Sequence, residues 1–265
     1  MNIVIFSKDR ALQLELLLRS MKQFFRESIV YKPSIIYKAS TPDFQKGYDK
    51  LKEIHTEFNY IPETNFRDNV LACLSDYSKN YTVFFVDDNV FVAPFSPMDR
   101  EFHHWTERLN ISTLSLRMHP GVTYCYTANI QTPSPVPLIS DPFTWYYPTC
   151  KGDWGYMCSL DGHVFRSHEI RPLINRVRFS NPNSLEDAIA TYPWGSYMCC
   201  YQTPRILNIA ANRVQTYNNN RNMGVSVEAL NSEFLNGKRI ALEPLLSIRA
   251  NAPHCEAPYT LEPLC

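Results

Sequence analysis

This chain has little glycine and no excess of charge of either sign. Only 8 of its 265 residues are glycine. Neither the dinucleotide-binding fingerprint G-x-G-x-x-G nor a Walker A loop occurs, which excludes dehydrogenase and ATPase functions of those types. Lysine plus arginine number 26 and aspartate plus glutamate also number 26. The resulting net charge of zero excludes a domain-wide basic field, so we expect no nucleic-acid partner.

Long hydrophobic runs and paired cysteine motifs are also missing. No apolar run approaches the roughly 18–20 residues of a membrane span. The opening run, Ile3 to Phe6, is too short for the core of a secretory signal. The eight cysteines include no C-x-x-C pair and no Cys/His spacing typical of structural zinc. We therefore expect free thiols, a reducing compartment and a cytoplasmic protein without a transmembrane segment.

The first half of the chain alternates apolar strand patterns with helical ones. Continuous β-branched and aromatic runs are typical of strands buried on both faces of a parallel sheet. Ser7 or Asp9 is expected to cap the first helix. Strands are expected at residues 3–6, 34–39, 60–62 and 81–86, and helices at 12–21, 42–54 and 65–77. The alternation predicts an α/β fold, a single domain with a mostly parallel central sheet and helices on both faces.

The second half is less regular. Residues 132–148 are rich in proline and aromatics and have no helical period, so they are interpreted as a long loop with strand fragments. Elsewhere the pattern predicts helices at residues 97–109, at 167–174 and from 185, and strands at 113–117, 164–165 and within 205–211. A tail that packs on the body is expected after residue 218.

Two adjacent aspartates, Asp87 and Asp88, follow the strongest strand of the chain. Open α/β sheets bind ligands at the carboxyl ends of their strands. Neighbouring carboxylates are costly to hold together unless a positive group neutralises them. A divalent cation does so, and oxygen ligands suit Mg²⁺ or Mn²⁺. The alternative is a solvated loop in which Asp88 caps the next turn.

The acidic turn and three other segments, in this order and spacing, resemble GT-A glycosyltransferases, including bacterial and viral members. Residues 84–94, FFVDDNVFVAP, resemble the DxD-type motif, in which a hydrophobic strand delivers acidic residues to a metal-bound nucleotide-sugar. Residues 3–10 look like the first strand and nucleotide-binding loop, and residues 158–166 look like an acceptor-side segment. Glu186-Asp187 is similar to an acidic pair that starts a late helix. The resemblance covers about residues 1–220, although this turn reads Asp-Asp-Asn and not Asp-x-Asp.

The resemblance implies a metal-bound nucleotide-sugar donor. Asp88 would be the main ligand of Mn²⁺ or Mg²⁺, Asp87 would reach the ribose or the metal through water, and His254 would complete the coordination. The other donor contacts would be Ser7, Lys8, Arg10, Arg67 and Arg213. Structural alternatives stay open for these residues: a helix cap or a salt bridge to Glu15 for the first loop, a surface pair for Arg67, and a solvated tail for His254.

The resemblance also implies an acceptor side. Trp154 would offer an aromatic face to a sugar ring, next to the turn at Asp161 and Gly162, unless its ring belongs to the core. A general base must lie within hydrogen-bond reach of the acceptor hydroxyl. We expect Asp187 or Glu186 to be that base, with Asp187 favoured. The alternatives are Asp161 as the base, or a pair that merely complements the helix dipole.

The leading hypothesis is a metal-dependent glycosyltransferase that moves a sugar from a nucleoside-diphosphate sugar, a UDP-sugar, to a hydroxyl of a glycan or glycoconjugate, as in polysaccharide biosynthesis. Residues 1–95 would bind the donor, residues 96–220 would bind the acceptor, and residues 221–265 would form a tail or lid. Two alternatives remain. A nucleotidyltransferase usually carries a glycine-rich phosphate-binding loop near its N-terminus. The first loop here, residues 7–10, contains no glycine, which disfavours this function. A non-catalytic carbohydrate-binding member of the fold would keep the aromatics and lose the metal.

Overall fold

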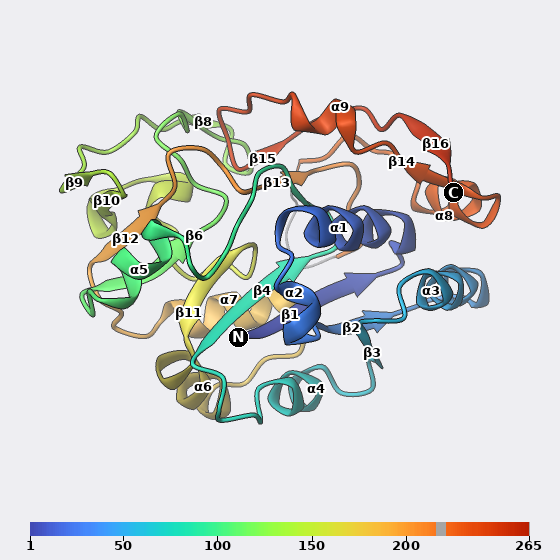
Figure 1. The fold of residues 1–265 in the computed structure, drawn as a ribbon, viewed down its shortest axis with the longest axis horizontal. Coiled ribbons are helices and arrows are strands. Elements are labelled where there is room, and N and C mark those ends of the chain that lie inside the picture. The colour runs from blue at the N-terminus through green and yellow to red at the C-terminus, as the bar shows by residue number, and fades with distance from the viewer. Residues whose placement is uncertain (216–220, 265) are drawn as a thin grey trace.

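One nine-stranded sheet forms the centre of the molecule (Figure 1). The computed structural model describes residues 1–215 and 221–264. The strand order is β3-β2-β1-β4-β11-β6-β12-β10-β9. Strands β11 and β10 are antiparallel to both of their neighbours, and the other strands share one direction. The sheet is thus mixed but mostly parallel, and the expected α/β class is confirmed. The strands span β1 Asn2–Lys8, β2 Ser34–Lys38, β3 Asn59–Pro62, β4 Tyr81–Val86, β6 Ile111–Ser115, β9 Ile139–Ser140, β10 Phe143–Tyr146, β11 His163–Arg166 and β12 Tyr197–Cys200.

Alternate side chains of β1 enter two separate hydrophobic cores. Ile3 and Ile5 belong to one core, whereas Val4 and Phe6 belong to the other. Successive strand residues point to opposite faces, so a strand that is covered on both sides must be apolar throughout. This is why the opening run of the sequence shows no polar alternation.

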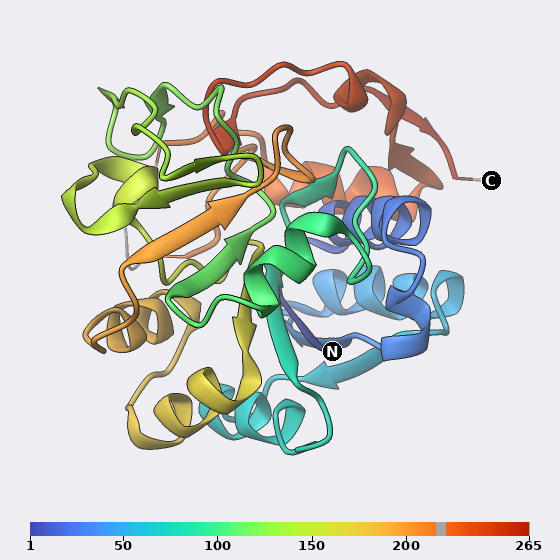
Figure 2. The same ribbon diagram turned by 60° about the vertical axis from the view of Figure 1, so that its left-hand side comes forward.

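Helices cover both faces of the sheet (Figures 1 and 2). One core receives side chains from α1, α3 and α8, and the other receives them from α4, α6 and α7. Figure 2 shows the C-terminal segment, in red, lying along the same side as α1. The helices span α1 Ala11–Phe24, α3 Pro42–Ile54, α4 Phe66–Cys73, α6 Ser167–Arg176, α7 Pro182–Ala190 and α8 Val227–Leu235.

Polar side chains cap several of these helices, but α1 begins differently from the expectation. Thr41 caps α3 and Asn65 caps α4 by accepting backbone N–H bonds. Helix α1 starts after Arg10 and has no side-chain cap. Asp9 has a positive φ of 59°, and its carboxylate accepts hydrogen bonds from the Ser40 backbone (2.6 Å) and hydroxyl (2.7 Å). The prediction that Ser7 or Asp9 caps α1 was therefore wrong, because both side chains bind elsewhere.

A smaller three-stranded sheet lies beside the end of β4. Its order is β15-β13-β5, formed by His254–Cys255, Ile206–Ile209 and Asn89–Phe91. Strand β13 is antiparallel to β5 and parallel to β15, and Asn208 is opposite both Asn89 and His254. This sheet brings residues from the late part of the chain to the acidic turn.

The remaining elements are short. The expected helix at residues 97–109 is observed as α5, Arg100–Thr106, and the expected loop at 132–148 contains β9 and β10. The others are α2 Ser28–Tyr31, β7 Tyr124–Cys125, β8 Ile130–Gln131, the 3₁₀ turns Tyr147–Thr149 and Gly152–Gly155, β14 Lys238–Ile240, α9 Glu243–Leu246 and β16 Leu261–Pro263.

Two further sequence expectations concern thiols and membrane spans. The seven described cysteines are all free thiols. Within residues 1–215 and 221–264, no helix combines the length and apolar character needed to cross a bilayer.

Candidate functional site

The acidic turn lies where the buried strand β4 ends and β5 begins. Asp87 is buried and is held by the loop after β1: its Oδ2 accepts hydrogen bonds from the Ser7 hydroxyl (2.9 Å) and the Lys8 backbone N–H (3.0 Å). The parallel pairing of β1 with β4 places these two strand ends side by side. The expected neighbourhood of Ser7, Lys8 and Asp87 is thus present at the carboxyl edge of the sheet.

Arg10 bridges the two carboxylates of the acidic turn. Its Nη1 lies 2.9 Å from Asp87 Oδ1 and 3.1 Å from Asp88 Oδ2. Its Nε and Nη2 donate to the side chain and the carbonyl of Asn212. Burial alone would lower the pKa of Arg10, but Asp87 and Asp88 raise it above its usual value. Arg10 is the group that neutralises the acidic pair in this structure.

Asp88 faces the small sheet. Its Oδ1 accepts a hydrogen bond from Asn208 Nδ2 at 2.9 Å. Burial, together with the nearby charges of Asp87 and Asp161, raises the pKa of Asp88 to about 6, although Arg10 and His254 oppose the shift. The largest cause of this shift is the loss of hydration on burial, which disfavours the ionised form of Asp88. A cation bound next to Asp88 would stabilise the ionised form.

Asp161 links the acidic turn to the second half of the chain. Its carboxylate accepts hydrogen bonds from Asn89 and Asn208, and it contacts His254 Nε2 at 3.2 Å. Arg117 Nη1 lies 3.1 Å from the same carboxylate. Burial opposes ionisation, yet the contacts with His254 and Arg117 hold the pKa of Asp161 well below its usual value. Asp161 thus connects the acidic turn to Arg117 and His254.

Arg117 is the second buried cation of this edge. It is 2% exposed, and its Nη2 contacts Asp153 at 3.3 Å in addition to the contact with Asp161. It follows the alternating strand β6, where every residue is buried. The carboxyl edge thus carries two arginines, each paired with two carboxylates.

Glu186 and Asp187 differ in their surroundings. Glu186, near the start of α7, accepts hydrogen bonds from the Leu160 backbone N–H (2.6 Å) and the Tyr156 hydroxyl (3.3 Å). Burial raises the pKa of Glu186 to about 7, with a further contribution from Asp161, while Leu160 and Arg117 oppose the shift. Asp187 is exposed. The capping box that starts α7 uses Asn181 and Ser184, so neither acidic residue is the helix cap.

The structure places Trp154 and Gly162 in structural roles. Trp154 is 1% exposed, its indole N–H donates to the Val122 carbonyl, and its ring packs edge-on against Trp145. It therefore presents no face to a sugar, contrary to the expectation. Gly162 has a φ of +74°, and an added Cβ would clash with Ile206 Cδ1. This glycine lets the chain turn tightly between Asp161 and β11.

The remaining predicted residues lie at different distances from the acidic turn. Lys8 Nζ donates to the Val214 carbonyl and so holds residues 212–215 across the end of β1. Arg213 is exposed within this segment. Arg67, at the start of α4, donates to the carbonyls of Asn175 and Val177 and ties α4 to the end of α6. The asparagine-rich segment 218–222, for which the sequence alone suggests a lid over the nucleotide, lies largely outside the described residues.

The metal ligands inferred from the sequence can be tested against the chemistry of these side chains. Within the described part of the chain, no group of three or more His, Cys, Asp or Glu residues is arranged as a metal site. Both oxygens of Asp87 bind protein donors, and both oxygens of Asp88 do so as well, accepting from Asn208 and Arg10. Asp88 is the less buried of the two carboxylates, and the buried His254 Nδ1 has no hydrogen-bond partner among the described residues, so Asp88 and His254 fit a metal better than Asp87 does. Carboxylate and imidazole are suitable ligands for Mn²⁺.

The sequence reading missed Asn208, Arg117, Asn89 and Asn212. Arg117 ends a period-two strand pattern, and a charged residue in such a strand is a usable signal when the other residues are apolar or small. Asn89 directly follows the acidic turn and could have been included with it. Nothing in the local sequence marks Asn208 or Asn212, which are brought to the site by the pairing of β13 with β5 and by the arginine at position 10.

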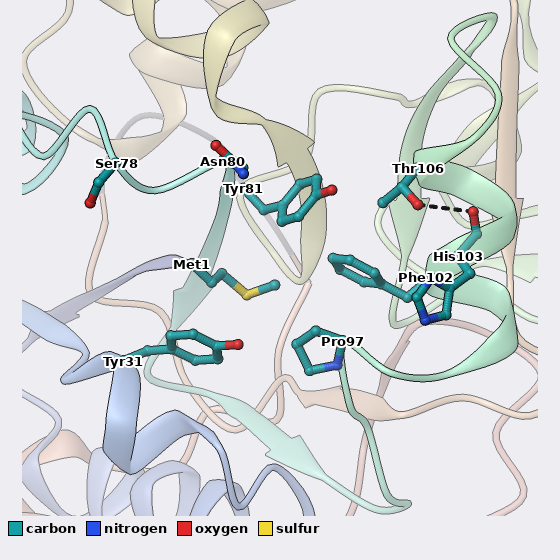
Figure 3. A pocket seen from close by; sticks show the side chains of 9 residues that line it. All are labelled: Met1, Tyr31, Ser78, Asn80, Tyr81, Pro97, Phe102, His103 and Thr106. Atoms are coloured by element: carbon teal, nitrogen blue, oxygen red, sulfur yellow. Dashed lines mark hydrogen bonds between the residues drawn. The ribbon is translucent and has the colours of Figure 1, made fainter.

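Two cavities open at the opposite, amino-terminal edge of the sheet. One, of about 300 Å³, is surrounded by the rings of Tyr31, Tyr81, Pro97 and Phe102 near Met1 (Figure 3). The other, of about 520 Å³, lies between α6 and the segment before β4. No site residue predicted from the sequence lines either cavity, so the acidic turn and these cavities are separate features.

Comparison with known proteins relates the chain to glycosyltransferases. No family model matches it. Its sequence is 27% identical over 202 residues to the bifunctional glycosyltransferase pgtA of Dictyostelium discoideum, and this similarity covers 66% of the chain. The chain spans only 25% of the length of that relative. The resemblance to glycosyltransferases inferred from the motifs is confirmed by this similarity.

Solved structures show weaker similarity. They include S. aureus TarS residues 1–349 (TM-score 0.41, 9% identity, 78% of this chain and 60% of that chain). The same TarS fragment in complex with UDP-GlcNAc gives a TM-score of 0.40 at 11% identity, over 77% of this chain and 59% of that one. The mannosyltransferase PcManGT from Pyrobaculum calidifontis in complex with GDP-Man and Mn²⁺ gives 0.38 at 11% identity, over 77% and 55%. The fold assignment rests on the chain's own sheet.

Proposed function

We propose that this chain is a glycosyltransferase of the GT-A type that transfers a sugar from a nucleoside-diphosphate sugar, a UDP-sugar, to a hydroxyl of a glycan or glycoconjugate. The observation that carries the proposal is the charge network at the carboxyl edge of the sheet, which joins the acidic turn to Asp161 and the cations around it. The sequence similarity to a glycosyltransferase supports the same reaction class.

The loop after β1 and the acidic turn form the donor side in this proposal. Arg10, Ser7 and the Lys8 backbone fix Asp87, so that Asp87 orients the turn. Asp88 and His254 would hold Mn²⁺ or Mg²⁺, which when bound supplies positive charge to the departing diphosphate. Lys8 lies at the same strand end and holds the segment that includes Arg213, whose charge would contribute to diphosphate binding.

Glu186 is the proposed general base. Its pKa of about 7 lies near neutral pH, where a base balances being ionised against accepting a proton. In an inverting reaction, Glu186 takes the proton of the acceptor hydroxyl while that oxygen bonds to the anomeric carbon. The bond from this carbon to the diphosphate oxygen breaks, and its electron pair leaves with the diphosphate. This assignment replaces the earlier preference for Asp187, because Glu186 is the more enclosed carboxylate.

Calorimetric titration of UDP, with and without Mn²⁺, tests the donor side. Wild-type protein should bind UDP more tightly with Mn²⁺, and Asp88→Asn should remove this metal-dependent gain while the fold, followed by circular dichroism, is retained. Asp43→Asn, at an exposed site on α3, is the matched control and should behave as wild type. Equal UDP affinity with and without metal in the wild type would contradict the metal assignment. Release of UDP from a panel of UDP-sugars then tests sugar transfer. If the protein instead converts CTP and a sugar phosphate into a nucleotide-sugar, the nucleotidyltransferase alternative is favoured.

A further inference from the structure

The cavity between α6 and the segment before β4 has a basic lining. We call it the basic groove and define it by Tyr77, Lys79, His168, Arg171, Pro172 and Arg176, which are among its lining residues. Its volume is about 520 Å³, within the range of small-molecule sites. Its lining, within the part of the chain that the structure describes, includes no aspartate or glutamate. A hollow bordered by several basic side chains and no acidic one favours an anionic ligand.

Arg171 distinguishes the basic groove from an ordinary basic surface. Four arginines of the described chain are buried: Arg10, Arg117, Arg166 and Arg171. The first two each pair with two carboxylates, and Arg166 lies 3.8 Å from Glu169. Arg171 is 6% exposed, yet no carboxylate of the described residues lies within 4 Å of its guanidinium. Asp76 interacts with Arg171 only electrostatically, from beyond that distance. A buried cation that no carboxylate contacts is costly, and an oxyanion in the basic groove would supply the missing contact.

The contacts of Arg171 leave part of its guanidinium unused. Its Nη2 donates to the carbonyls of Asp76 (2.8 Å) and Lys79 (3.5 Å). Its Nε is buried and has no acceptor among the described residues. Nearby acids pair only loosely with the other cations, at 3.9 Å for Asp76 with Lys79 and 3.8 Å for Glu169 with His168. The basic groove therefore keeps an excess of positive charge.

Two apolar rings complete the lining. Tyr77 is 75% exposed and receives the Arg171 guanidinium against its ring at 4.3 Å, and Pro172 is exposed on α6. Ring faces of this kind pack against the C–H faces of a pyranose, whereas a bare inorganic anion gains nothing from them. The lining thus combines cations for an oxyanion with surfaces for a sugar ring.

We propose that the basic groove binds an acidic sugar, one that carries a carboxylate or phosphate, as a carbohydrate subsite separate from the acidic turn. The groove lies at the start of β4 and the acidic turn lies at its end. Six residues at about 3.3 Å each separate them by roughly 20 Å. The choice of a sugar rests on the proposed glycosyltransferase function, in which a second subsite would hold a distant unit of the acceptor glycan.

Amide chemical-shift titrations with four probes test the proposal: glucuronate, glucose 6-phosphate, glucose and inorganic phosphate. The two acidic sugars should shift resonances of residues 77–80 and 167–176 at lower concentrations than glucose or phosphate. A preference for one acidic sugar identifies which oxyanion the groove takes, and either preference supports the proposal. If glucose bound as tightly as the acidic sugars, the charged side chains would not contribute to binding and the proposal would be wrong. If inorganic phosphate bound as tightly as glucose 6-phosphate, the sugar ring would not contribute to binding and the groove would be only an anion site.

Two variants and a matched control locate the binding. Arg176→Ala and Lys79→Ala should each weaken acidic-sugar binding roughly tenfold, as expected for the loss of a charge-assisted contact. Arg178→Ala removes the same charge two residues away, at an exposed position outside the groove lining, and should leave binding unchanged. An equal loss in all three variants would overturn the assignment to the groove. UDP titration of the same samples separates the two proposals, because a failed groove leaves UDP binding intact and a failed donor site leaves acidic-sugar binding intact.

Discussion

The two edges of the central sheet treat buried arginine in opposite ways. At the carboxyl edge, Arg10 and Arg117 each contact two carboxylates. At the amino-terminal edge, Arg171 is nearly as buried but contacts backbone carbonyls and a tyrosine ring. The first arrangement fixes acidic side chains in place with their charges balanced. The second leaves positive charge available to a ligand. Buried arginine therefore has a structural role at the carboxyl edge and a ligand-binding role at the amino-terminal edge.

The largest expected effect concerns turnover at the carboxyl edge. Glu186→Gln keeps the shape of the side chain but removes its proton-accepting role, so turnover should fall about 10²–10⁴-fold with UDP affinity nearly unchanged. Steady-state kinetics and calorimetry measure the two quantities. Asp187→Asn is the matched control on the same helix and should lose much less. If Asp187→Asn is the sensitive variant, the base assignment reverses.

Next in size is the loss of a paired buried arginine. Arg117→Met leaves Asp153 and Asp161 without their shared cation, and breaking such a buried pair costs about 3–5 kcal/mol of the free energy of unfolding. Urea unfolding followed by circular dichroism measures the change. A loss below about 1 kcal/mol would mean that water or a bound ion compensates the two carboxylates.

The carboxyl edge should also impose a pH dependence. Glu186 must be ionised to accept a proton, so turnover should rise with pH and level off above about 7. The free energy of unfolding should depend on pH in the opposite direction. Because folding raises the pKa of Glu186 from 4.5 to about 7, the folded state holds this proton more tightly than the unfolded state. The stabilisation from this proton is complete below about pH 4.5 and is lost as the pH rises through 7. The charged or titratable groups near Glu186 include Arg117, Asp161, Tyr156 and Cys158. In a pH–rate profile, the rise in turnover near pH 7 should be absent from Glu186→Gln. A rise that persists in this variant would belong to another group.

The smallest expected effect is at the amino-terminal edge. Arg171→Met removes two hydrogen bonds to carbonyls and the contact with Tyr77, but it also removes a buried charge that no carboxylate of the described residues contacts. These opposing terms should change the free energy of unfolding by no more than about 1 kcal/mol. The same urea experiment measures it, with Arg117→Met as the reference. A loss as large as that of Arg117→Met would erase the difference between the two edges.

Local sequence patterns predicted the parallel half of the fold well because each of its elements is determined locally. The apolar runs that form β1 and β4 are covered on both faces, and the turn after β4 has no other place than the carboxyl edge. Helix α3 likewise begins at Thr41 and Pro42, residues whose capping and backbone preferences are readable without tertiary structure.

The rest of the site depends on contacts between distant parts of the chain. Strand β15 has only two residues and lies in a proline-rich segment, so no hydrophobic pattern in the sequence predicts it. Asn208 matters because β13 pairs with β5, and that register follows from the whole structure. Trp154 is a case in which a local pattern was misleading. Its position before Asp161 suggested a sugar-binding surface, but in the structure its ring is buried against Trp145.

The contacts of Asp161 have a consequence for synthesis of the protein. This carboxylate is bound by Asn89, Arg117, Asn208 and His254, which lie up to 93 positions away along the chain. A ribosome has to translate past residue 254 before the last of these donors exists. Until then, Asp161 lacks one of its four partners. Contacts so distant in sequence make folding slow, and we expect the carboxyl edge to be the last region of the growing polypeptide to acquire its native arrangement.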